Sequence, residues 1–146
     1  MLIAGGDLDE RKLTSGYVFL LNNRVISWSS KKQSCIALSI MKAEFVAFSA
    51  AVQEAVWLKS FLSHLGIKED ASNPVLVNCN SQAAIAFTKD SKYHSKTKHI
   101  DIKYNFVRDM DVQKEVSIQY ISMHKMVVDP LLNPYLEVLL PIMLDL

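Results

Sequence analysis

The stretch TSGYVFLLNNRVISWS, residues 14–29, decides how the fold begins. Two runs rich in aromatic and β-branched residues flank the pair Asn22-Asn23, and asparagine tolerates the positive φ angles of a tight hairpin turn. This pattern predicts a β-hairpin. The polar segment that follows, Ser30–Ser34, predicts a loop.

The segment after this loop carries the strongest helical pattern in the chain. Apolar residues recur at spacings of three and four from Ala43 to Leu65, which is the period of one face of an α-helix. Ser39 is placed to cap the start of this helix, and Gly66 is placed to end it. One long helix packed on the hairpin is therefore expected.

Shorter elements follow along the chain. The β-branched run Val75–Cys79 predicts a buried strand, and residues 81–88 predict a short alanine-rich helix. The apolar stripe of residues 100–110 predicts a further helix, and the alternation in Glu115–Ile121 predicts a strand with one wet face. The order β-β-α-β-α-α-β is typical of a layered α/β fold. Residues 131–146 are apolar with two prolines and no clean period, so no standard element is predicted there.

Composition favours a single globular domain. The chain has 146 residues, of which 50% are hydrophobic and 21% charged, and a formal net charge of +1 that gives no global attraction to nucleic acid or lipid. Cys35 and Cys79 are far apart, which argues against a disulfide framework or a zinc site. The sequence shows no signal peptide and no membrane-spanning run. An intracellular protein, cytoplasmic or nuclear, with no membrane partner is expected.

Two features of the residues pose a functional question. Glu44 and Asp129 are acids among apolar neighbours, although periodicity alone favours simple exposure to solvent for each of them. A local basic cluster surrounds Tyr93, where cations can bind phosphates and the ring can stack on a base, although a solvated loop is the simpler reading. The cluster comprises Lys89, Lys92, His94, Lys96, Lys98, His99 and Lys103.

Five motifs in one order carry a family resemblance. They are DLDERKLTSGYVF (7–19), ISWSSKKQ (26–33), ALS (37–39), EAVWLK (54–59) and HSKTKHIDIKY (94–104). Together they closely resemble the RNase H domain of copia-type LTR-retrotransposon Pol polyproteins. The resemblance runs from Gly6 to Pro134, so residues 1–134 are expected to form an N-terminally truncated RNase H-like domain, and residues 135–146 a divergent apolar tail.

The resemblance implies an RNase H-like fold, in which helices flank both faces of a mixed five-stranded sheet. The family's first strand is missing here or reduced to Met1–Ala4. The implied activity is hydrolysis of the RNA strand of RNA–DNA hybrids during reverse transcription. Four carboxylates hold two Mg²⁺ ions about 4 Å apart for this reaction. The implied partners are the hybrid and a reverse transcriptase domain.

The family's catalytic positions are only partly kept. Glu44 matches the helical glutamate and is the best-supported metal ligand, but Lys42 stands where a neighbouring glutamate is usual. Asn80 replaces the central catalytic aspartate. An amide oxygen can coordinate Mg²⁺, but it brings no charge.

The family's other catalytic carboxylates are also only partly kept. Asp129 matches the closing aspartate, although the Thr-Lys pair that follows it in the family is lost. Asp7 and Asp9 match the loop after the missing first strand, so neither is a metal ligand. Two of four ligands survive, Glu44 and Asp129, which predicts a weak or absent Mg²⁺ site and a pseudoenzyme with little or no nuclease activity.

Two alternatives remain open. The basic segment, with Lys92, His94, Lys96, Lys98 and His99, can hold nucleic acid without cutting it, as a non-catalytic binding module. The chain can also be a relic open reading frame without a selected role. A folded module melts cooperatively, whereas a relic is expected to fold poorly.

Overall fold

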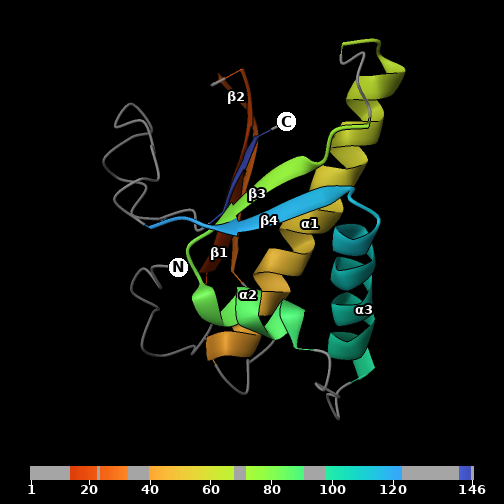
Figure 1. Ribbon diagram of the computed structural model, residues 1–146. Coiled ribbons are helices and arrows are strands. Elements are labelled where there is room, and N and C mark those ends of the chain that lie inside the picture. The colour runs from red at the N-terminus through yellow and green to blue at the C-terminus, as the bar shows by residue number, and fades with distance from the viewer. Residues whose placement is uncertain are drawn as a thin grey trace.

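The computed structural model describes residues 14–22, 24–32, 40–67, 72–90, 98–122 and 142–145. Its elements are β1 (Thr14–Leu21), β2 (Arg24–Lys32), α1 (Ile40–His64), β3 (Val75–Cys79), α2 (Gln82–Lys89), α3 (Lys98–Val112), β4 (Val116–Tyr120) and β5 (Ile142–Asp145). The five strands form one mixed sheet in the order β2-β1-β5-β3-β4, with the helices packed against it (Figure 1).

The predicted hairpin is confirmed. β1 and β2 pair antiparallel, and Asn22 at the turn has a φ of 50°. The predicted loop at Ser30–Ser34 is wrong for residues 30–32, because the ladder continues until Thr14 pairs with Lys32, and residues 33 and 34 lie outside the described part of the chain. Backbone pairing with β1 thus extends the strand through residues whose polar side chains suggested a loop.

The long helix α1 is confirmed, and it forms the centre of the core. Phe45, Phe48 and Val52 on its inner face are fully buried, and the helix contacts β1, β3, β4 and β5. By length and composition alone, Met41–His64 would suffice to cross a membrane. More than half of the apolar window within it is buried in the chain itself, and a core helix passes the same test of length and composition.

Gly66 ends α1 as predicted. Its φ is +68°, in the left-handed region, where glycine has no Cβ to clash. The amide of Gly66 donates to the Ser63 carbonyl at 3.0 Å, and the amide of Ile67 donates to the Leu62 carbonyl at 3.2 Å. This pair of bonds is a Schellman motif, which satisfies carbonyls that the end of the helix leaves unpaired.

The second half of the chain supplies the rest of the core. β3 and β4 pair in parallel, and Val75, Val77 and Val116 are buried at the interface with the helices. The predicted stripe on α3 is confirmed, because Ile100, Tyr104 and Val107 are buried; Met110 is partly buried and packs against the core.

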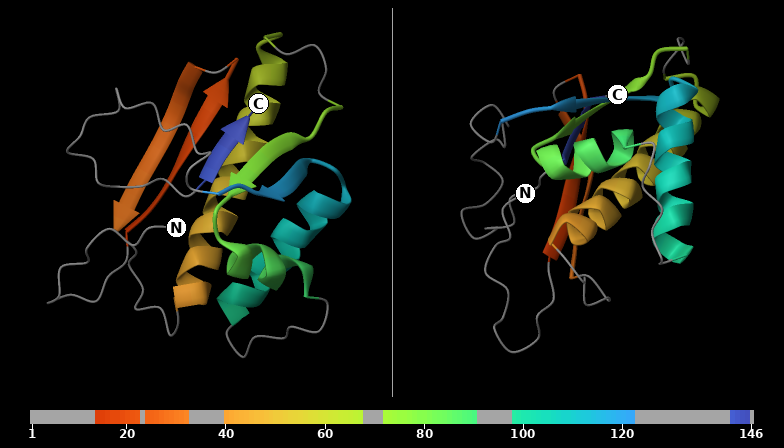
Figure 2. Two further views of the ribbon diagram at one scale, coloured as in Figure 1. Left: turned by 60° about the vertical axis from the view of Figure 1, so that its left-hand side comes forward. Right: turned by 60° about the horizontal axis from the view of Figure 1, so that its bottom comes forward.

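β5 was not predicted, and it lies at the centre of the sheet (Figure 2). It runs parallel to β1 and antiparallel to β3, so it joins the hairpin to the β3–β4 pair. A strand of four residues directly after Pro141 is too short to show a period, and its partners lie far away in the sequence. Residues 142–145, expected within a divergent tail, pair with both halves of the sheet.

The three helices contact one another and form one layer on one face of the sheet (Figure 2). In the described parts of the chain no helix covers the other face. The expected arrangement with helices on both faces therefore stays a prediction for that side.

Candidate functional site

Glu44, the residue that the resemblance singles out as a metal ligand, lies at the junction between β3 and α2. Glu44 is half-buried near the start of α1, and its Oε2 atom accepts a hydrogen bond from the Ser81 hydroxyl at 2.5 Å. Ser81 is the N-cap of α2, and its Oγ atom accepts a bond from the Ala84 amide at 3.1 Å. One serine hydroxyl therefore fixes both the start of a helix and the position of the carboxylate.

Asn80 lies next to Ser81, at the end of β3. Its Oδ1 atom is buried, and the described residues give it no hydrogen-bond partner. An unpaired buried oxygen is costly, so this atom calls for a donor, a water or a cation. The sequence prediction that Glu44 and Asn80 belong to one site is thus consistent with their places beside Ser81 on adjoining elements.

Cys79 completes the junction, and sequence reasoning did not include it in the site. Its side chain is buried, and its Sγ atom accepts a bond from the Ser81 amide at 3.4 Å. Burial raises the pKa of the Cys79 thiol to about 11, the Ser81 backbone bond acts in the opposite direction, and the Glu44 carboxylate raises it further. The thiol is therefore protonated at neutral pH and is not a nucleophile.

The set of metal ligands that the resemblance implies is incomplete within the described residues. They supply Glu44 as a carboxylate and Asn80 as an amide, and they contain no group of three or more His, Cys, Asp or Glu side chains that could hold a metal ion. Asp129, Asp7 and Asp9 lie outside the described residues. Of the four carboxylates that the resemblance implies, the described residues therefore supply one, Glu44.

The central strand brings no acid to this junction. Ile142 of β5 pairs with Cys79, and Asp145 pairs with Leu76 at the opposite end of β3. Three strand residues span about 10 Å. The one acidic residue of β5 is therefore placed away from Glu44.

Lys42 does not share a helix face with Glu44. Residues two apart on a helix point in nearly opposite directions. Lys42 is half-buried and has interactions of its own. The helix geometry therefore does not place the Lys42 ammonium group beside the Glu44 carboxylate.

The predicted nucleic-acid segment is described only at its end. Lys98 and His99 are exposed in the first turn of α3, whereas Lys92, His94 and Lys96 lie outside the described residues. The Tyr104 hydroxyl donates to the Asp90 carbonyl, which ties α3 to the end of α2.

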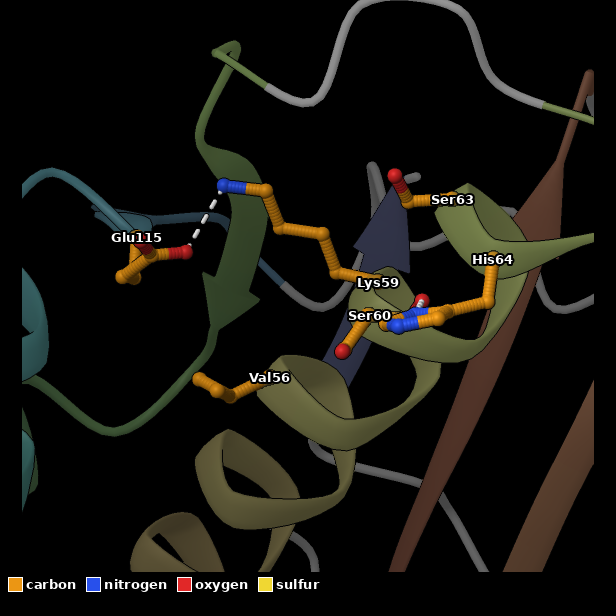
Figure 3. A pocket seen from close by; sticks show the side chains of 6 residues that line it. All are labelled: Val56, Lys59, Ser60, Ser63, His64 and Glu115. Carbon is orange, nitrogen blue, oxygen red and sulfur yellow. Dashed lines mark hydrogen bonds and ion pairs between the residues drawn. The ribbon is translucent and has the colours of Figure 1, made fainter. Parts of the chain in front are cut away.

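A second location, which the sequence did not indicate, is a pocket of about 320 Å³ at the far end of α1 (Figure 3). Lys59 is 7% exposed there, and its ammonium group binds the Glu115 carboxylate at 2.8 Å. His64 contacts the Ser60 carbonyl through Nδ1 at 2.7 Å. Lys59 is four residues after Ala55 and three before Leu62, so it lies on the same apolar face of α1. A lysine at this position of the helical period is therefore expected to be buried.

The sequence was compared with known proteins. The retrovirus-related Pol polyprotein from transposon TNT 1-94 of Nicotiana tabacum is 42% identical over 117 residues, which is 80% of this chain. The corresponding polyprotein from transposon RE2 of Arabidopsis thaliana is 33% identical over 129 residues, or 88% of this chain. The chain spans 9% of the length of each polyprotein.

A shorter match involves a protein of another description. The secreted RxLR effector protein 161 of Plasmopara viticola is 55% identical over 53 residues, which cover 36% of this chain and 37% of that protein. No protein-family model matches the sequence. No solved structure matches the chain. The long matches establish that the chain is a homologue of one segment of the retrovirus-related Pol polyproteins of copia-type transposons.

Proposed function

We propose that the chain is a degenerate RNase H-like domain of such a polyprotein, and that it does not cleave RNA–DNA hybrids. The observation that supports this most strongly is the junction of β3 and α2. There Glu44 is bound to Ser81, beside an amide, Asn80, at the position where the resemblance implies an aspartate.

The chemistry of the site explains why this arrangement disables the reaction. A pair of bound Mg²⁺ ions would supply activation of water and stabilisation of the leaving oxygen. Mg²⁺ gives up its water reluctantly and is held mainly by anionic oxygens. Glu44 offers one such oxygen that is not engaged by Ser81, and Asn80 offers a neutral one. Asp129 is the other carboxylate that we assign to the site from the resemblance.

The direct test is cleavage of a labelled RNA–DNA hybrid by the full chain with Mg²⁺ or Mn²⁺. We expect no Glu44-dependent product from the unaltered chain. The Asn80→Asp variant restores one carboxylate only, so we expect no product from it either. Cleavage by the unaltered chain that the Glu44→Ala variant loses would overturn the proposal.

A second candidate function is binding of nucleic acid without cleavage. It is favoured by the exposed side chains of Lys89 in the last turn of α2 and of Lys98 and His99 in the first turn of α3, two helices that the Tyr104–Asp90 bond joins. We assign Lys92, His94 and Lys96 to the same surface from the sequence. In this reading the partner is an RNA–DNA hybrid, and a reverse transcriptase domain is a further candidate partner.

Salt dependence tests this second function. If the surface holds phosphates, the affinity for a hybrid falls steeply with salt, and Lys98→Gln reduces the slope of log K against log salt by about 1. Lys114→Gln is the matched control, because Lys114 is exposed beyond the other end of α3. Equal effects of the two substitutions would contradict a specific surface at Lys98.

A further inference from the structure

The pocket at the far end of α1 contains a buried lysine that the protein satisfies only in part. The Lys59 side chain is more than nine-tenths buried, and its ammonium group lies 2.8 Å from the Glu115 carboxylate (Figure 3). An ammonium group has three N–H donors, and within the described residues this carboxylate is the one hydrogen-bond partner of Lys59. Buried donors without partners are costly, so Lys59 calls for acceptor oxygens inside the pocket.

The other polar groups of the pocket add both donors and acceptors. Ser60 and Ser63 supply hydroxyl groups, each of which can donate and accept. The Nδ1 atom of His64 lies 2.7 Å from the Ser60 carbonyl, which can only accept, so Nδ1 carries the proton and Nε2 of the neutral ring is an acceptor. The Glu115 oxygen that Lys59 does not engage, Oε1, is a further acceptor.

The charges around the pocket favour an uncharged ligand. Lys59 and Glu115 neutralise each other, so the lining has no net charge when His64 is neutral. The pocket also lies at the C-terminal end of α1, where the helix dipole is negative. An anion bound to Lys59 would lie against the Glu115 carboxylate and this helix end, whereas a cation bound to Glu115 would lie against the Lys59 ammonium group.

The size and the apolar part of the lining narrow the choice further. A volume of about 320 Å³ is at the lower end of the range of ligand pockets, about 300 to 1,000 Å³. Val56 adds an aliphatic surface beside the polar groups. A small ring with hydroxyl groups at its edge and C–H groups on its face matches both parts of this lining.

We propose that this pocket binds an uncharged polyhydroxylated molecule of the size of a monosaccharide. Ligand hydroxyl groups accept from the Lys59 ammonium group and donate to Oε1 of Glu115, while the C–H face of the ligand contacts Val56. The inference requires no nucleic acid and no metal, so it stands or falls independently of the proposed function.

Titration of the full ¹⁵N-labelled chain with D-glucose, and separately with myo-inositol, tests the proposal through amide chemical shifts. We expect saturable shifts at residues 56–64 and 115 with at least one of the two probes. Lys59→Met keeps the long aliphatic stem but removes the donors, and we expect it to weaken binding about tenfold. Lys98→Met is the matched control, because Lys98 is exposed at the other end of α3, and it should leave the affinity unchanged.

Ser60→Ala supplies a variant that keeps the buried ion pair, since Ser60 is exposed and binds His64 through its backbone. We expect it to weaken binding about threefold while the remaining amide spectrum stays that of the folded chain. Inorganic phosphate should give no saturable shift at these residues.

Three results would overturn the proposal. The absence of a saturable response to both probes would mean that the pocket holds only water. Saturable binding of phosphate without a response to either probe would mean that Lys59 recruits an anion. Equal affinities of the unaltered chain, Lys59→Met and Ser60→Ala would place the binding outside the pocket.

Discussion

At the scale of single residues, Ser81 links the stability of the fold to the candidate site. Its hydroxyl caps α2 and also donates to Glu44. We expect Ser81→Ala to lower the free energy of unfolding by about 1 kcal/mol, the usual cost of a lost N-cap. Urea unfolding followed by circular dichroism measures this change.

Ser81→Thr is the matched control, because threonine keeps the hydroxyl and caps helices nearly as well. We expect it to retain most of the stability that the alanine variant loses. Equal losses in the two variants would mean that the hydroxyl does not cap α2, which would contradict the described junction.

The burial of Cys79 should make the free energy of unfolding depend on pH. The pKa of its thiol is about 11 in the folded chain because of burial, against an ordinary value of 9.0. Between these values the unfolded chain releases the proton and the folded chain retains it, so the free energy of unfolding decreases as pH rises from about 9 towards 11. Burial also raises the pKa of Tyr17, which acts in the same direction. Urea unfolding at a series of pH values measures the decrease.

The Cys79→Ala variant separates the thiol from other titrating groups. We expect a smaller decrease over this pH range in the variant than in the unaltered chain. A Cys79 that reacts rapidly with a thiol reagent in the folded chain at pH 8 would contradict its described burial, because the thiolate is the reactive form.

At the scale of an element, the end of α1 depends on one backbone conformation. Gly66 has a φ of +68°, and a Cβ added there meets nothing within 4 Å. Gly66→Ala therefore destabilises the chain through the backbone conformation and not through clashes with neighbouring residues. We expect the free energy of unfolding to fall by about 1 to 2 kcal/mol. Thermal or urea unfolding of the variant checks this value.

Gly66→Asn provides the comparison, since asparagine adopts the left-handed region more readily than alanine. We expect it to lose less stability than Gly66→Ala. If the alanine variant is as stable as the unaltered chain, the Schellman motif at the end of α1 is not formed.

At the scale of the whole molecule, local patterns predicted local structure well. The hairpin around Asn22, the period of α1 and the stop at Gly66 each depend on a few neighbouring residues, and the structure confirms them. β5 could not be predicted in this way. Its stability comes from backbone pairs with β1 and β3, which the sequence of residues 142–145 does not encode locally.

The residues of the candidate site could be predicted one by one, but the contacts between them could not. The resemblance singled out Glu44 and Asn80 one position at a time. The contact between Glu44 and Ser81 joins α1 to the start of α2 across 37 residues, and the packing of the helices creates it. Serine is common at the N-cap position that Ser81 occupies, but nothing in the local sequence connects Ser81 to a carboxylate.

We propose that the site lacks the negative charge needed to hold divalent metal. Binding of Mn²⁺ by the full chain, followed through the electron paramagnetic resonance signal of the free ion, tests this most directly. We expect the unaltered chain and Glu44→Ala to leave the free-ion signal equally unchanged at micromolar Mn²⁺. Saturable binding by the unaltered chain that Glu44→Ala abolishes would instead mean that the site holds divalent metal through Glu44.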